Sequence, residues 1–235
     1  CIYWASGKNT RNFFINQSNL MTMGRYEEVR DRATEVMTQQ AMANAAMQAG
    51  KIDEALDYAT AGADIAEKIL KEYEDIGASY VVYCNATGFR FQLLDAIKDY
   101  QNAFFAAFVA IYTTCPYLAK RLDEEHFCCL FATQLTQMFV SFRDFVEYKG
   151  YLEQDDEVGQ KAYETIDLMF QITYNAFDLL KLVAPDNRMV APMSNILKQM
   201  EEAGFERYDD CKDLNWQACL ERVYDNLVSM KIIDE

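Results

Sequence analysis

Residues 42–58 read MANAAMQAGKIDEALDY, and this stretch carries the clearest structural signal in the chain. A helix predicted over 26–49 ends at Gly50, and the acidic pair Asp53-Glu54 then suits the start of a second helix, because carboxylates oppose the positive end of the helix dipole. Beyond the turn, apolar residues recur at the helical steps of three and four, namely Ile52, Leu56, Ala59, Ala63, Ala66, Leu70 and Tyr73. The stretch therefore predicts a helical hairpin.

Helical spacing continues through the rest of the chain, with apolar stripes over 93–111, 162–180 and 216–230. The 235 residues include only 9 Gly and 3 Pro, too few for the frequent turns of a β-sandwich or barrel. We expect an all-α fold of stacked antiparallel hairpins, in a solenoid or a bundle of eight or nine helices. Helix breaks are predicted at Gly24, Gly50, Gly77, Gly88, Pro116, Gly150, 184–187 and Gly204. The absence of a Pro-rich or Gly/Ser-rich linker predicts a single domain over 1–235.

Residues 38–70 resemble one tetratricopeptide repeat, whose turn reads Gly, polar, bulky, acidic, acidic, Ala, Leu. The resemblance implies that Gly50 allows the tight turn, Ile52 packs into the hairpin and Ala55 lets the two helices approach closely. Residues 12–76 are accordingly expected to form hairpins of this kind. Beyond Gly77 the repeat period is lost, and 78–235 are expected to form an extension of longer helices.

The same resemblance marks Asn44 as a candidate partner-binding residue. In peptide-binding members of the family, a Lys and an Asn on the first helix of a repeat hold a terminal carboxylate. Asn44 stands at the Asn position, whereas Gln40 stands where the Lys would be. The pattern therefore does not predict a carboxylate clamp.

The chain is strongly acidic, with 22 Lys+Arg against 37 Asp+Glu and a formal charge of −15. Direct binding to nucleic acid is not expected, because it requires clustered Lys and Arg. The charge favours a basic or apolar-basic protein or peptide partner, and in the other interpretation it only keeps the protein in solution. The acidic loop with Asp155, Asp156 and Glu157 supplies further candidate partner-binding residues.

The seven cysteines are odd in number and form no CxxC motif. This usage is typical of free thiols in a reducing compartment, so the sequence predicts a cytoplasmic protein. The alternative is that Cys1 is the lipid-bearing residue of a lipoprotein. Residues 100–119 and 126–142 carry no formal charge, but their polar residues favour two neighbouring core helices over membrane spans.

His126 is the only histidine, so any mechanism that needs histidine depends on it. Asp123, His126 and Cys129 lie three residues apart on one predicted helix and are the metal-ligand candidates, with further ligands required from another helix, such as Cys84 or Cys115; the other interpretation places His126 at the edge of the core. No nucleophile, zinc-protease, P-loop or dinucleotide motif is present. We therefore expect no cofactor, no bound metal and no enzymatic activity.

Phenylalanine and methionine crowd the central helices, in residues such as Phe104, Phe131, Phe142, Met169 and Phe177. As core residues they fit a non-enzymatic helical-repeat scaffold that binds a protein or peptide, including a second copy of itself. As a pocket lining they fit a bundle that binds an apolar small molecule or lipid. Both hypotheses remain open at this point.

Overall fold

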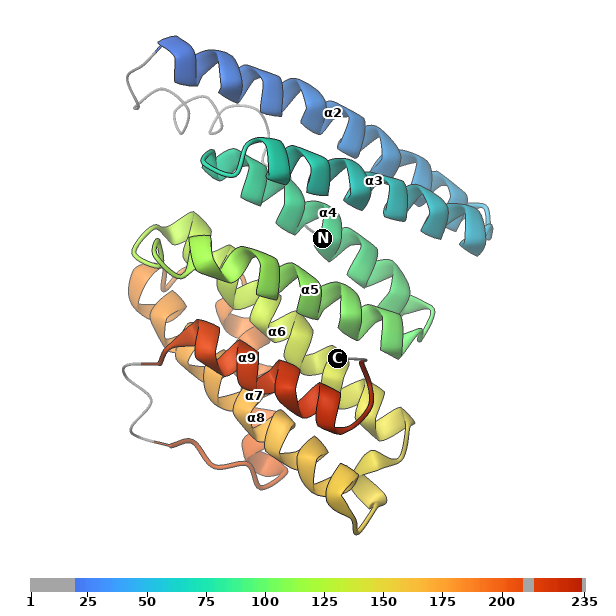
Figure 1. Cartoon of the computed structure of the whole chain (residues 1–235), viewed down its shortest axis with the longest axis vertical. Coiled ribbons are helices and arrows are strands. Elements are labelled where there is room, and N and C mark those ends of the chain that lie inside the picture. Colours follow the sequence, from blue (N-terminus) through green and yellow to red (C-terminus); the bar gives the residue numbers. More distant parts are fainter. Residues whose placement is uncertain (1–19, 209–213, 234–235) are drawn as a thin grey trace. The chain divides into compact units, whose positions relative to one another are not determined.

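A computed structural model describes residues 20–208 and 214–233 (Figure 1). These residues form eight α-helices and one 3-10 helix and contain no strand. The elements are α2 (Leu20–Gln48), α3 (Ile52–Glu72), α4 (Gly77–Ala96), α5 (Tyr100–Leu118), α6 (Glu125–Tyr148), η1 (Tyr151–Glu153), α7 (Glu157–Val183), α8 (Val190–Glu202) and α9 (Trp216–Ser229). Neighbouring helices pack as antiparallel hairpins, so the all-α prediction is confirmed.

The described residues divide into two compact units, one ending at Leu93 and the other beginning at Leu94. The division falls near the end of α4, the helix that begins at Gly77, where the pattern of the sequence changes. The single domain expected over 1–235 stays a prediction, and each unit is described separately below.

In the first unit, α2 and α3 form the predicted hairpin. Gly50 adopts a φ of +73°, a left-handed conformation that a side chain disfavours. Small residues let the helices approach closely: Ala55 is fully buried, and a Cβ on Gly62 would lie 3.3 Å from the Cβ of Gln39. Ile52 does not pack into the hairpin as expected, because its side chain is 44% exposed at the first position of α3.

Three predicted helix breaks are wrong. Gly24 lies inside α2 and Gly88 inside α4, because a helix tolerates a single glycine at a cost of about 1 kcal/mol. Pro116 lies in the last turn of α5, where its missing N–H removes only one helical hydrogen bond. A break without glycine or proline occurs instead after α4, where Lys98 takes a φ of +62° and Asp99 caps α5 by accepting from Asn102 N.

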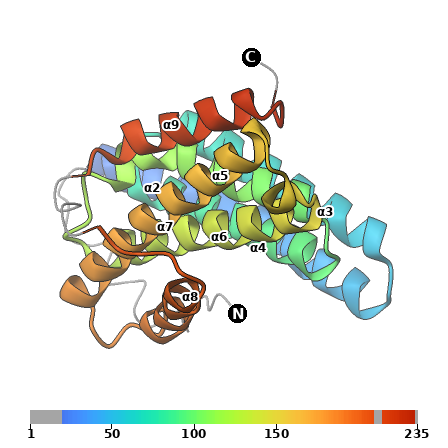
Figure 2. The ribbon, with the colours of Figure 1, turned by 90° about the horizontal axis from the view of Figure 1, so that it is seen from below.

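In the second unit, α6 packs between α5 and α7, and α7 also contacts α8 and α9. Figure 2 shows α8 and α9 on opposite sides of this layer. Its core is aromatic: Phe104, Phe142 and Phe145 are fully buried, with the Phe104 ring centroid 5.0 Å from Phe142 and 6.1 Å from Phe145. The expectation that α5 and α6 are neighbouring core helices is confirmed.

No helix in the described part of the chain combines the length and the apolar character needed to cross a membrane.

Candidate protein-binding surfaces

A shallow groove in the first unit lies between α2 and α4, with an open volume of about 10 Å³, enough for roughly one water molecule. Six residues line it: Ala33, Val36, Met37 and Gln40 from α2, and Val82 and Asn85 from α4. The valines and Ala33 are buried and form its floor, whereas Met37 is 41% exposed at its rim. The predicted residue Asn44 is exposed and lies one helical turn beyond Gln40, which places it on the same side of α2.

A small core further along α2 joins the three described helices of the first unit. Ala43 of α2, Ala59 of α3 and Leu93 of α4 are buried together, and Met47, Leu56, Tyr58 and Phe89 pack against them. Because the three helices share this core, the lining of the groove is carried on rigid elements rather than on loops. The polar groups of the groove lining are the neutral amides of Gln40 and Asn85, beside the flexible side chain of Met37.

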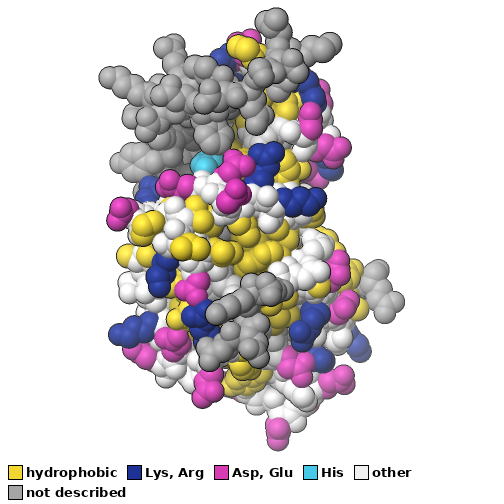
Figure 3. Space-filling model, turned by 90° about the vertical axis from the view of Figure 1, so that its left-hand side faces the viewer, with side chains coloured by type: hydrophobic (Ala, Val, Ile, Leu, Met, Phe, Trp, Pro, Cys, Tyr) yellow, Lys and Arg dark blue, Asp and Glu magenta, His cyan; other side chains and the backbone are white. Residues whose placement is uncertain are grey.

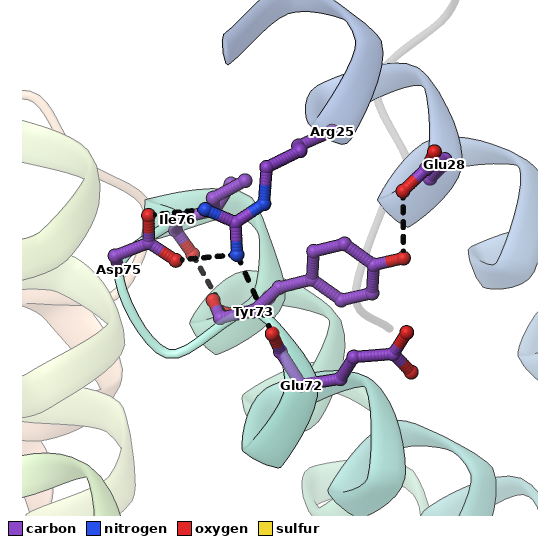
Figure 4. Close-up of polar contacts among 7 residues, drawn as sticks. Arg25, Glu28, Glu72, Tyr73, Asp75 and Ile76 are labelled. Atoms are coloured by element: carbon purple, nitrogen blue, oxygen red, sulfur yellow. Dashed lines mark hydrogen bonds and ion pairs between the residues drawn. The ribbon is translucent and has the colours of Figure 1, made fainter. Parts of the chain in front are cut away.

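A charged cluster joins the end of α3 to the first half of α2 (Figure 4). Arg25 binds both carboxylate oxygens of Asp75, at 2.6 and 2.9 Å, and its guanidinium lies 5.4 Å from the ring centre of Tyr73. The Tyr73 hydroxyl donates to Glu28 Oε2 at 2.9 Å, and this bond, together with desolvation, raises the pKa of Tyr73. Arg32 forms an ion pair with one carboxylate oxygen of Glu72.

Carboxylates thus already neutralise both arginines of this cluster. Arg25 also donates to the main-chain oxygen of Glu72, so the guanidinium holds the turn that follows α3. The cluster closes the end of the hairpin opposite Gly50 and is not arranged to receive an anion. Its ion pairs are half exposed, and such pairs contribute about 0–1 kcal/mol each.

The acidic loop of the second unit borders an open hollow of about 460 Å³. Asp155, Asp156 and Glu157 are all exposed, and the first two line the hollow beside Glu153 and Tyr163. Asp156 also has a structural task, since its Oδ1 accepts hydrogen bonds from Val158 N at 3.0 Å and Gly159 N at 3.1 Å and so caps α7. Asp155 and Glu157 have no such capping role.

The three metal-ligand candidates do not form a ligand set. Asp123 is exposed in the loop before α6, and His126 is exposed in the first turn of α6 with its ring against Phe127. The Cys129 thiol instead donates to Asn187 Oδ1 at 3.6 Å. Within residues 20–208 and 214–233 there is no group of three His, Cys, Asp or Glu residues that could hold a metal ion.

The cysteines within the described ranges are free thiols. Burial raises the pKa of Cys115 to about 12 and that of Cys128 to about 11, so both stay protonated at neutral pH. They act as small core residues. Cys1, on which the lipoprotein alternative depends, lies outside the described residues.

Sequence analysis did not single out a polar contact along α7. Gln171, buried inside the second unit, donates from Nε2 to the main-chain oxygen of Glu206 at 2.7 Å, and its Oε1 accepts from Tyr208 N at 3.1 Å. An extended segment, 205–208, is thereby attached to the helix. The local signal was the sequence Phe205-Glu206-Arg207-Tyr208 after Gly204, which lacks helical spacing.

The buried phenylalanines of the second unit pack on other aromatic rings and line neither of the two hollows described above. Hydrophobic side chains also reach the surface, and Figure 3 shows several of them gathered in a patch. Comparison with known proteins identified no relative, since no family model, no curated protein and no solved structure matches the chain.

Proposed function

We propose that this protein is a non-enzymatic helical scaffold that binds a protein or peptide partner in the groove between α2 and α4. The observation that carries the proposal is the composition of that groove: buried small apolar residues at the floor, with Met37, Gln40 and Asn85 at the rim. Methionine adapts its shape to different apolar side chains, and amides bond to a peptide main chain. Asn44 extends the same surface by one turn.

The partner is expected to be basic or apolar-basic. The net charge of −15 attracts positive segments over long range, and the groove itself offers apolar surface rather than a counter-charge. Charge would then speed the encounter, while apolar contacts would hold the complex. The likeness of the α2–α3 hairpin to a tetratricopeptide repeat supports a peptide-binding role as well, and a cytoplasmic location is part of the same proposal.

The alternative proposal, an apolar small molecule or lipid among the Phe and Met side chains, has less support. Phe104, Phe139 and Phe170 are fully buried, and each packs on another ring, with Phe104 5.0 Å from Phe142 and Phe139 6.3 Å from Phe170 between ring centroids. A ligand would have to displace this packing. Extraction of the purified protein with organic solvent, followed by mass spectrometry, would reveal a lipid if the alternative holds.

The two exposed methionines of α2 provide a matched test. Met37 lines the groove, whereas Met42 is exposed to a similar degree, 39% against 41%, and is not part of the lining. Peptides selected from a displayed random library should be rich in Lys, Arg and apolar residues. Their affinity, measured by fluorescence anisotropy, should fall at least about tenfold with Met37→Lys and stay within about twofold with Met42→Lys.

Equal effects of the two substitutions, or selected peptides that are acidic, would contradict the proposal. Asn44→Ala supplies an independent check, because it removes a polar group from the same surface without adding charge. Far-UV circular dichroism should show unchanged helicity for all three variants, because all three positions are exposed.

A further inference from the structure

The second unit holds one of its own extended segments on a helix face. Residues 205–208, Phe-Glu-Arg-Tyr, follow α8 without helical structure. They lie on the face of α7 formed by five residues at helical spacing, Asp167, Phe170, Gln171, Tyr174 and Asp178. We refer to these five residues as the α7 face.

Gln171 recognises the main chain of the segment rather than a side chain. One amide group bonds both to the oxygen of Glu206 and to the N–H of Tyr208, so it spans the two peptide groups on either side of Arg207. The Gln171 side chain is oriented for this, since Nε2 also lies 3.3 Å from Asp167 Oδ1 and the residue is only 4% exposed. A buried amide used in this way fits any extended peptide.

The other residues of the α7 face contact the side chains of the segment. The Arg207 guanidinium lies 4.4 Å from the ring centre of Tyr174 and pairs with Asp178. The Phe205 ring centroid lies 6.0 Å from that of Phe170. The Tyr208 hydroxyl donates to Asp167 Oδ2 at 3.0 Å. The face therefore fits an aromatic residue, any residue, an arginine and a tyrosine in succession.

We propose that the α7 face is a recognition site for an extended, basic-aromatic segment of a partner protein, and that residues 205–208 occupy it when the partner is absent. The segment lies at the surface, because Glu206, Arg207 and Tyr208 are exposed while Gln171 beneath them is buried. The acidic net charge favours the approach of an arginine-bearing competitor. This site lies in the second unit, so it does not depend on the groove between α2 and α4.

The test replaces the segment and supplies it again as a separate molecule. In the emptied variant, Phe205→Gly, Glu206→Ser, Arg207→Gly and Tyr208→Ser are combined in the full chain. The probe is a fluorescein-labelled peptide with the sequence of residues 203–208 and blocked ends. We expect saturable binding to the emptied variant and at least about tenfold weaker binding to the wild type, whose own segment competes at millimolar effective concentration.

Adding Gln171→Ala to the emptied variant should weaken its affinity for the probe at least about tenfold, because both main-chain hydrogen bonds are lost. A probe with glutamate in place of its arginine should not bind. An emptied variant with wild-type helicity that does not bind the probe would overturn the proposal. So would equal binding with and without Gln171→Ala.

A milder variant provides a second test that does not require the emptied variant to fold. Arg207→Ala keeps the main-chain bonds to Gln171 but removes the ion pair with Asp178, so it should bind the probe more tightly than the wild type does. If Arg207→Ala binds the probe no more tightly than the wild type does, the proposal is contradicted. Dimerisation of the wild type that the probe reverses, seen by analytical ultracentrifugation, would assign the face to a second copy of the chain and also overturn it.

Discussion

A Cβ atom on Gly159 would lie 2.0 Å from the main-chain oxygen of Gln154. The same atom would lie 3.0 Å from the oxygen of Tyr151, so the first turn of α7 rests directly on the turn that contains η1. Only glycine permits this approach. The acidic loop and its hollow owe their shape to this contact.

We therefore expect Gly159→Ala to destabilise the protein by about 1–3 kcal/mol or more, because backbone atoms must move to admit the methyl group. Gly24→Ala is the matched control, since a Cβ there meets nothing within 4 Å inside α2. The control should be neutral or stabilising by up to about 1 kcal/mol. Urea denaturation measures both changes, and a neutral Gly159→Ala would contradict this account of the turn.

The close approach of α2 and α3 predicts the effect of enlarging Ala55. Its side chain is fully buried in the first unit, so Ala55→Leu should overpack the core of this unit and lower the free energy of unfolding by about 1–3 kcal/mol. Ala45→Leu adds the same atoms at an exposed site of α2 and should change stability by less than about 0.5 kcal/mol. Identical melting temperatures for the two variants would show that Ala55 is not at the helix contact.

Within the acidic loop, Asp156 caps α7 whereas Asp155 does not, so the two residues are expected to differ in their effect on stability. Asp156→Ala should cost about 0.5–2 kcal/mol of stability, because two N–H groups at the start of α7 lose their acceptor. Asp155→Ala, which removes a neighbouring exposed carboxylate without capping function, should cost less than about 0.5 kcal/mol. Thermal melts at constant ionic strength would compare them, and a larger loss for Asp155→Ala would refute the assignment.

Ionisation of the Asp95 carboxyl group is expected to make the stability of the protein depend on pH. Burial, with a contribution from the negative charge of Asp144, raises the pKa of Asp95 above its usual value. The folded protein then binds this proton more tightly than the unfolded chain does. As the pH rises through the usual Asp pKa of about 3.9 to the higher folded-state pKa, ionisation of Asp95 therefore lowers stability.

Asp95→Asn should accordingly be more stable than the wild type at pH 7, and the difference should shrink toward zero below about pH 4. Asp186→Asn, at an exposed turn, serves as the control for the loss of one charge from an acidic protein. Denaturant titrations at several pH values would measure the difference. A constant difference across the whole range would mean that the charge of Asp95 does not matter.

Local pattern alone was sufficient to predict the hairpin and the helical class. The three- and four-residue spacing after Gly50 reports the buried stripe of α3 directly, and the turn needs a conformation that glycine adopts readily. Breaks at Gly24 and Gly88 were predicted wrongly, because packing along a long helix outweighs the cost of one unfavourable residue, and Pro116 lies too close to the end of α5 to interrupt it.

The tertiary structure alone decided which polar groups meet. Gln171 contacts residues 35 and 37 positions further along the chain, and Arg25 contacts Asp75 across 50 positions. Neither pair has a spacing that a helix or a turn would reveal, since each depends on where two separate elements come to lie. The sequence thus determined the helices, their first hairpin and the acidic character of the protein. Folding determined the groove between α2 and α4 and the α7 face, because those surfaces exist only where distant helices and segments pack together.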